Sequence, residues 1–326
     1  MPTPKWLTVS APPNAISGRL AISDIVSNVC YVLDGGIYDT GAGVDFYSYN
    51  LLTDTWTVLT APAGGYLYNA TAPVLVRIGT TKVLAICDVE TPVYGWRGGN
   101  RVAIYDIAGG TWTYSSVHTW NTGPYSGSHI FSIAVQDSDT LWCFLQSDHY
   151  SPNVTMKCLR YVISTDTWTS FAAIYGDPSS RPISSGFAGG AVYGGGFGTG
   201  VVWIYTVATD AYSTATNPGT GYQFIAGAGP VGRIPFVNSA FTQLGYLDIS
   251  AAPVLSNVTD HLLAPSGVAS AYLFLGYSEI FSATPVESSR ASSTNNLLLT
   301  QQSAAGGNPN AYSAVSCYIG DAAPNV

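Results

Sequence analysis

The stretch Tyr161-Val-Ile-Ser-Thr-Asp-Thr-Trp168-Thr decides the fold, because it recurs along the chain. It reads as the end of one strand, a tight polar turn and the start of a second strand. In four copies two aromatic residues stand seven positions apart: Tyr49 and Trp56, Tyr105 and Trp112, Tyr161 and Trp168, Tyr205 and Tyr212. The copies begin at residues 49, 105, 161 and 205, so the steps are 56, 56 and 44 residues. Self-similarity at such spacings predicts a repeat architecture.

Short alternating strands and glycines precede the aromatic pairs. Residues 29–62 show this best, with an apolar run at 29–33, Gly35-Gly36, Gly41 and Gly43, then Tyr49-Asn50 and Trp56. This pattern resembles the kelch motif of β-propellers. The resemblance implies an all-β fold, a single β-propeller of kelch-like four-stranded blades. It implies almost nothing about chemistry, because propellers host many functions.

We expect one domain over residues 1–326 with six blades. Their approximate ranges are 20–62, 66–118, 125–173, 181–216, 221–257 and 264–320. The segment 5–10, which contains Trp6, resembles the stretch that starts at Trp56, so it is expected to complete the last blade beside a strand at 311–318. Such pairing would close the ring without free edges. Seven blades remain possible if 258–320 holds two reduced ones. The fifth repeat is degenerate, because Pro253 stands seven residues after Tyr246.

The composition limits the partners. Charged residues are 9% of the chain, with 11 Lys+Arg and a net charge of −8, so nucleic-acid binding is not expected. No apolar run approaches the ~20 residues that span a bilayer, and residues 1–6 do not resemble a signal peptide. We therefore expect no membrane insertion. The five scattered cysteines (Cys30, Cys87, Cys143, Cys158 and Cys317) are interpreted as buried thiols made in a reducing compartment.

No catalytic set emerges from the sequence. The repeated aromatics, Trp6 included, are expected to pack between blades, and the turn residues Asp54, Asp166 and Asp210 to accept bonds from nearby backbone N–H groups. The Asp box of sialidase-type propellers is not matched. The histidines His118, His129, His149 and His261 lack a spacing that would place two of them on one metal, as copper-radical oxidases of this fold require. We expect no enzyme activity, no metal and no cofactor.

Three polar segments rich in aromatics are the candidate ligand-binding site. The first carries Tyr94, Trp96 and Arg97, the second Trp120 and Tyr125, and the third His149 and Tyr150. Aromatic rings beside Asn, Asp and Arg suit stacking on sugars or docking on a protein. The alternative is that Trp96 and Trp120 pack beneath their own loops.

The sequence favours a non-enzymatic virion protein. A surface poor in charge and rich in Gly, Ser, Thr, Asn and Tyr is similar to that of bacteriophage structural proteins, so we expect a tail or capsid appendage. Its partners would be virion structural proteins or a host surface glycan, with multiple copies possible in a larger assembly. Its location would be the virion, after synthesis in the host cytoplasm. The alternatives are an intracellular kelch-type adaptor and a carbohydrate-active propeller enzyme.

Overall fold

The structure is a computed structural model of the 326-residue chain. It describes residues 6–14, 20–23, 25–34, 45–62, 75–90, 97–118, 128–147, 155–173, 175–176, 182–196, 201–216, 222–224, 233–238, 243–249, 258–263, 272–276, 295–303 and 312–321.

The described strands form six antiparallel sheets. The first contains β2 (Leu20–Ile22), β3 (Val29–Asp34), β4 (Asp45–Asn50) and β5 (Thr55–Leu59). The second contains β6 (Leu75–Ile78), β7 (Lys82–Glu90), β8 (Arg97–Asp106) and β9 (Thr111–Tyr114). The third contains β10 (Ser128–Val135), β11 (Thr140–Ser147), β12 (Thr155–Val162), β13 (Thr167–Ser170) and the short β14 (Tyr175–Gly176), which pairs with β12.

The remaining sheets repeat this order. The fourth contains β15 (Pro182–Ala188), β16 (Ala191–Gly196), β17 (Val201–Thr206) and β18 (Ala211–Thr216), with the 3-10 turn η1 (Val207–Thr209) before β18. The fifth contains β19 (Tyr222–Phe224), β20 (Arg233–Asn238), β21 (Gln243–Asp248) and β22 (Val258–Leu263). The sixth contains β23 (Tyr272–Gly276), β24 (Asn295–Ser303), β25 (Tyr312–Asp321) and, from the other end of the chain, β1 (Trp6–Val9).

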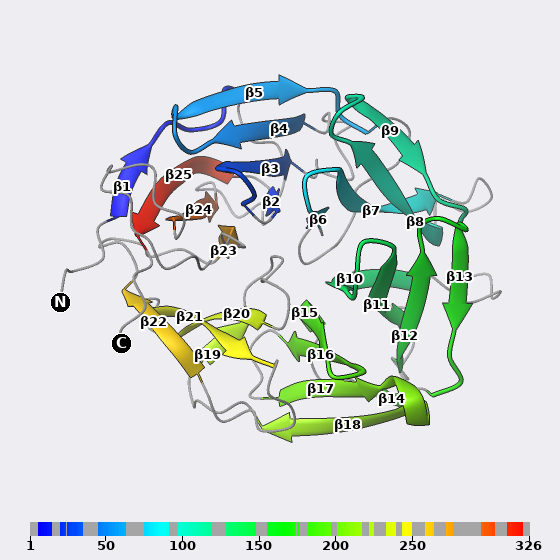
Figure 1. Cartoon of the computed structure of the whole chain (residues 1–326). Helices are drawn as coiled ribbons and strands as arrows, with labels where there is room; N and C mark the ends of the chain where they lie inside the picture. The colour runs from blue at the N-terminus through cyan, green and yellow to red at the C-terminus, as the bar shows by residue number, and fades with distance from the viewer. Residues whose placement is uncertain are drawn as a thin grey trace.

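The sheets stand side by side around a central axis (Figure 1). The first strand of a sheet, such as β6 or β10, lies nearest the axis, and the fourth, such as β9 or β13, lies at the rim. Burial follows this arrangement. All four residues of β6 are buried, whereas rim strand β5 has only exposed and half-buried positions. A strand enclosed on both faces reads as a continuous apolar run, and one at a surface reads as an alternation.

The core lies in the seams between neighbouring sheets. In the seam between the first and second sheets, Phe46 packs against Tyr105 and Trp112, with ring centroids 5.0 Å from each. Leu84 and Leu141 belong to the next seam, and Trp142 and Tyr205 to the seam between the third and fourth sheets. Flat-to-flat packing of sheets buries the large aromatic rings that dominate the core.

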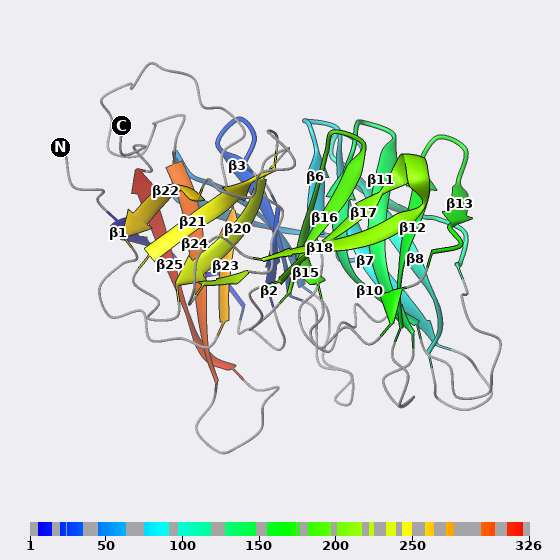
Figure 2. The ribbon, with the colours of Figure 1, turned by 90° about the horizontal axis from the view of Figure 1, so that it is seen from below.

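Two kinds of connection distinguish the ends of the sheets (Figure 2). In the first four sheets, tight turns join the first strand to the second and the third to the fourth, and the two turns of a sheet bond to each other. The four backbone bonds run from Leu51 N to Asn28 O (2.9 Å), Ile107 N to Thr81 O (3.0 Å), Ile163 N to Asp139 O (2.8 Å) and Val207 N to Gly190 O (3.1 Å). We call this end the turn face. The opposite end, where second strands finish and third strands begin, is the loop face.

A left-handed residue ends the repeated turn in all four copies. Asp54, Asp166 and Asp210 have φ values of 54°, 48° and 48°, and Gly110 has 64°. Aspartate and glycine tolerate this region better than other residues do. The repeated sequence Thr-Asp or Gly-Gly at this point is therefore set by the backbone of the turn.

The prediction of an all-β fold with four-stranded antiparallel sheets is confirmed. One predicted boundary was wrong. The fifth sheet was expected to end by residue 257, but its fourth strand is β22, which begins at Val258. The sequence between β21 and β22 contains Pro253, which has no N–H to donate to a ladder, so the regular seven-residue spacing fails there. The segment near the N-terminus pairs with β25, with Val9 opposite Cys317 and Trp6 opposite Gly320.

Candidate functional site on the loop face

The topology brings described strand ends that flank the three predicted ligand segments to one face. Segment 91–96 connects β7 to β8, and segment 148–154 connects β11 to β12, so each joins a second strand to a third. Segment 119–127 leads into Ser128, which pairs with Ser147 at the end of β11. Because corresponding strands of neighbouring sheets point the same way (Figure 1), the strand ends that flank these segments lie on the loop face.

The predicted ligand-binding side chains themselves lie outside the part of the chain that the structure describes. These are Tyr94, Trp96, Trp120, Tyr125, His149 and Tyr150. Arg97 begins β8, where its backbone pairs with Glu90, and its side chain is likewise outside the description. The structure thus places the ends of the segments on a common face and leaves the aromatic site a prediction.

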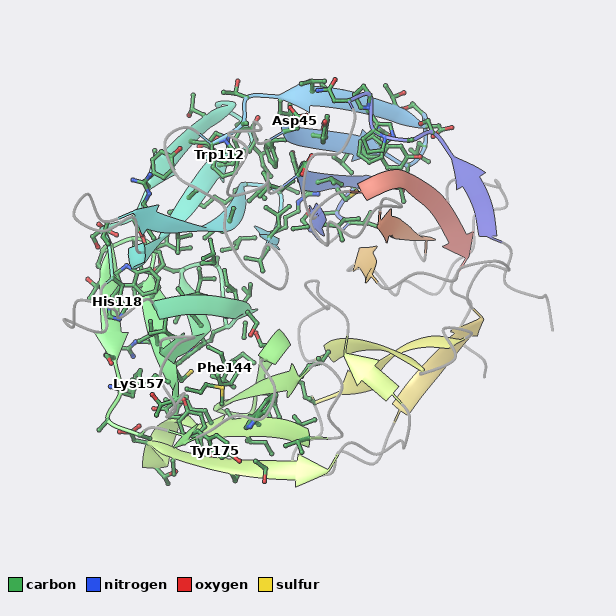
Figure 3. The ribbon with its side chains drawn as sticks, turned by 180° about the vertical axis from the view of Figure 1, so that it is seen from behind. Asp45, Trp112, His118, Phe144, Lys157 and Tyr175 are labelled. Carbon is green, nitrogen blue, oxygen red and sulfur yellow. The ribbon has the colours of Figure 1, made fainter. Side chains whose placement is uncertain are left out.

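A polar cluster occupies the same face of the first sheet. Asp34 ends β3 and lies opposite Asp45, which begins β4. Asp45 is labelled in Figure 3. Asp34 is fully buried and Asp45 is half-buried. The Tyr47 hydroxyl donates to Asp45 Oδ2 at 2.9 Å, and Asn14 Nδ2 donates to the same oxygen at 3.1 Å. Two carboxylates directly opposite on adjacent strands repel each other when both are ionised, so hydrogen-bond donors at this place are stabilising.

The electrostatics of this cluster keep Tyr47 a donor. Burial raises the pKa of Tyr47 far above its ordinary value, and the hydrogen bond to Asp45 raises it further. In this cluster both donors, Tyr47 and Asn14, bond to the Asp45 carboxylate, while Asp34 lies buried on the adjacent strand. Sequence reasoning missed it. The available signal was a pair of aspartates bracketing the glycine-rich stretch 35–44.

The repeated aspartates on the turn face have a structural role. Asp54, Asp166 and Asp210 each accept from the repeat tyrosine five residues earlier, at 2.7, 2.9 and 2.8 Å. Their backbone donors belong to the preceding repeat: Ser10 N, Ser116 N, and Ala172 and Ala173 N. These donors are near in space and 37 to 50 residues away in the chain. We call this arrangement, together with the repeat tryptophan, the rim latch.

The repeat tryptophans complete the rim latch. Their indole N–H groups donate to a carbonyl of the preceding repeat: Trp56 to Ser10 O (2.9 Å), Trp112 to Thr60 O (2.7 Å) and Trp168 to Ser116 O (3.0 Å). Within each copy the aromatic pair packs closely, and the Tyr49–Trp56 and Tyr161–Trp168 centroids are 4.5 and 4.6 Å apart. The fourth copy has Tyr212, whose ring lies 5.0 Å from Tyr205. The backbone of Trp6 is in β1, and its side chain is not described.

One histidine is placed in detail. The ring of His118 stacks on Trp168 at 5.4 Å, at the rim between the second and third sheets (Figure 3). Burial and then the charge of Lys157 lower its pKa. His129 and His261 lie in β10 and β22, with side chains outside the description. Among the described residues no three His, Cys, Asp or Glu side chains are grouped to hold a metal ion.

The described thiols are buried. Cys30, Cys143 and Cys158 lie inside the sheets as thiols rather than disulfides, and burial raises the pKa of Cys143 and Cys158 far above the ordinary thiol value. A protonated buried thiol is a poor nucleophile. Cys87 and Cys317 lie on β7 and β25, where only the backbone is described. A search of the described portion for a helix long and apolar enough to cross a membrane returned none.

Comparisons with known proteins locate the fold. No protein-family model matches the chain, and no curated protein matches it. A protein of unknown function from Dyadobacter fermentans DSM 18053 is similar over 99% of this chain and 100% of its own, with TM-score 0.62 and 8% identity. A luciferin-regenerating enzyme is similar over 97% and 95% of the two chains, with TM-score 0.52 and 9% identity.

These likenesses define the class of protein. The chain is an all-β protein with the β-propeller fold. At 8% and 9% identity the likeness concerns the fold alone, and fold does not specify function.

Proposed function

We propose that this chain is a non-enzymatic binding protein, a virion appendage that attaches to a neighbouring virion protein or to a host surface glycan through its loop face. The observation that carries the proposal is the convergence on that face. The ends of three aromatic-rich segments and the Asp34–Asp45–Tyr47–Asn14 cluster share it. Aromatic planes beside paired donors and acceptors are the chemistry that recognises sugars and polar protein surfaces.

The proposal includes the finer architecture. We infer one domain over residues 1–326, with six kelch-like blades and a ring closed by β1. The support is the six described sheets and the pairing of β1 with β25, four residues in register from Trp6 to Val9. Closure through the first and last strands removes free edges in the sixth sheet.

The composition supports a binding role in an assembly. With only 9% charged residues, long-range electrostatic steering contributes little, and recognition depends on contacts made by neutral polar and aromatic groups. Rim strands β5, β9 and β13 likewise contain no charged residue. The proposed location is a virion, after synthesis in a host cytoplasm. A cellular adaptor is the alternative, and a carbohydrate-active enzyme is a weaker one.

A glycan array and a cell-binding assay on the purified chain test the proposal. Two loop-face variants, Tyr94→Ala/Trp96→Ala and Trp120→Ala/Tyr125→Ala, are compared with a turn-face control. Leu52→Ala is a matched control, because Leu52 is 42% exposed in the β4–β5 turn. We expect the parent and the control to bind, and both loop-face variants to lose at least tenfold in affinity.

Other outcomes separate the alternatives. Turnover of a bound glycan would replace the binding role by an enzymatic one. Stable association with a cellular protein and no glycan binding would favour the adaptor. Equal loss of binding in the Leu52→Ala control would move the site away from the loop face.

A further inference from the structure

The seam between the second and third sheets contains a titratable residue where two other seams have proline. The rim latch fixes the register of the repeats, since Trp56, Trp112 and Trp168 bond to Ser10, Thr60 and Ser116. Two residues beyond these acceptors stand Pro12, Pro62 and His118. Proline cannot gain a proton, and histidine is the side chain that gains one near neutral pH.

The surroundings of His118 disfavour its charged form. The imidazole stacks on Trp168 at 5.4 Å, and its Nε2 atom is buried with no hydrogen-bond partner. Lys157 on β12 is the cation whose charge acts on it. Both burial and Lys157 lower the pKa of His118 below its ordinary value of 6.5, with burial the larger cause. A protonated imidazole here would be a desolvated charge beside a second positive charge.

Other described charges nearby are already engaged. The Asp166 carboxylate accepts from Ser116 N at 2.9 Å and from Tyr161. Arg160 on β12 lies over the ring of Phe171, and Arg101 on β8 lies over the ring of Tyr114. Side chains alternate between the two faces of β12. Leu159 faces the His118 seam and Cys158 faces the seam with the fourth sheet. Lys157 therefore shares the face of Leu159, and Arg160 lies on the opposite face.

The segment that carries His118 is also the segment that joins the two sheets. Ser115 bonds to Val102 of its own sheet in both directions, through its N–H and its hydroxyl. Ser116 then bonds to Asp166 and to Trp168 of the third sheet. If the His118 ring moves away from Trp168, it strains the bonds of Ser116, two residues earlier in the chain, to Asp166 and Trp168.

We propose that His118 makes the seam between the second and third sheets a pH-responsive latch, which loosens when its imidazole is protonated. This device goes beyond the proposed binding function and is independent of any ligand. The neutral ring stacks on Trp168 and holds Ser116 against Asp166. The protonated ring is repelled by Lys157 and drawn to water, so residues 116–118 leave the third sheet while the sheets themselves stay folded.

The sign of the pH dependence follows from linkage. Because the pKa of His118 is depressed in the closed state, its stabilisation is fully present above 6.5 and is lost as pH falls through the closed-state pKa. If the opened segment has an ordinary histidine pKa of about 6.5, the opening equilibrium increases by at most about 30-fold at pH 5.

Hydrogen exchange resolved by NMR tests this latch on the whole chain. Protection of the Ser116 amide, corrected for intrinsic exchange, is compared at pH 7 and pH 5, while the Ser115 amide, which bonds to Val102 within the second sheet, should not change. We expect a loss of several-fold to about 30-fold in the parent. His118→Phe keeps an aromatic ring on Trp168 without a proton site, so its protection should not change with pH. Amides of β3 and β4, in the first sheet, serve as the internal control.

A second variant keeps the proposal falsifiable if His118→Phe does not fold. Lys157→Gln should raise the pKa of His118, measured by imidazole NMR titration, and reduce the loss of protection at pH 5. The proposal is overturned if Ser116 protection in the parent is equal at both pH values. It is also overturned if His118→Phe keeps the full pH response, or if the His118 pKa is 6.5 or higher.

Discussion

At the residue scale, one copy of the rim latch lacks its aspartate. Asp54, Asp166 and Asp210 each bridge a repeat tyrosine and the preceding repeat, and Gly110 holds the same position in the second sheet. A Cβ built at Gly110 would lie 3.7 Å from the Tyr105 hydroxyl, close to where the aspartates of other copies bond. The backbone is already left-handed, which aspartate tolerates.

Gly110→Asp is therefore expected to stabilise the chain. The new carboxylate would accept from Tyr105 and from Thr60 N, at the position where Ser10 and Ser116 serve in other seams. A net gain of about 1 kcal/mol in the free energy of unfolding is expected from hydrogen bonds of this kind. Urea denaturation measures it. Gly110→Ala is the control and should destabilise, since it adds strain at φ +64° without an acceptor.

A second residue-scale prediction concerns acid stability. The hydrogen bond from Tyr205 lowers the pKa of Asp210 below 3.8, and the N–H groups of Ala173 and Ala172 act in the same direction. The stabilisation is complete above the unfolded value of about 3.8 and is lost as pH falls through the lower folded value. Tyr205→Phe should move the Asp210 pKa back toward 3.8 in a carboxyl NMR titration. Tyr49→Phe, at a different seam, should leave it unchanged.

At the element scale, the innermost strands of the third and fourth sheets contain two unusual serines. Ser132 shares a face of β10 with Ala134, and Ser185 shares a face of β15 with Phe187, so both face the seam between these sheets. Each is at least 95% buried, and neither hydroxyl has a hydrogen-bond partner. A β-bulge precedes each residue.

Removal of either hydroxyl should cost nothing. A buried hydroxyl without a partner contributes no bond, so Ser132→Ala and Ser185→Ala should change the free energy of unfolding by less than about 0.5 kcal/mol or increase it. Ser115→Ala is the matched control. That buried hydroxyl accepts from Val102 N and donates to Ser116 O, and its loss should cost about 1–3 kcal/mol. A similar cost at Ser132 would contradict the absence of a partner.

The same scale shows what the sequence could predict. Strands β4, β8 and β12 could be predicted because apolar alternation and the Tyr–Trp spacing coincide there. The fourth strand of the fifth sheet could not be predicted, since nothing in the local sequence distinguishes Val258–Leu263 from a loop after Pro253. The latch donors were also unreadable, because Ser10 and Ser116 reach Asp54 and Asp166 across 44 and 50 residues.

At the scale of the whole molecule, composition predicts which segments could bind a ligand, and the topology shows which strand ends lie on one face. Segments 91–96 and 148–154 could be proposed from composition. Their common face depends on how strands alternate in direction across separate sheets. The Asp34–Asp45 pair could not be predicted, because its residues are 11 apart in the sequence and become neighbours only when β3 and β4 pair. Pairwise chemistry across strands is a property of register, which local patterns do not encode.

The proposed closure of the ring yields a whole-molecule prediction. Val9 lies opposite Cys317 in the pairing of β1 with β25, and opposite residues of an antiparallel pair have Cα atoms about 4.5–5.5 Å apart, within disulfide range. Val9→Cys should oxidise to a disulfide, with a mobility shift on a non-reducing gel and a higher urea midpoint. Thr8→Cys, one position off register, should not pair with Cys317. Failure of Val9→Cys to cross-link in the folded chain would argue against the closure.

The rim latches also determine how the molecule bears force. Each rim latch bonds the outer edge of one sheet to the next sheet. A force that pulls the sheets outward is therefore resisted by these bonds. Among the described latches, the one at Gly110 lacks the aspartate, and Trp112 supplies its described rim bond. Nearer the axis, the Arg77 guanidinium also crosses this seam and donates to Val26 O and Val29 O of the first sheet. Under traction this seam would therefore yield before the other seams whose latches are described.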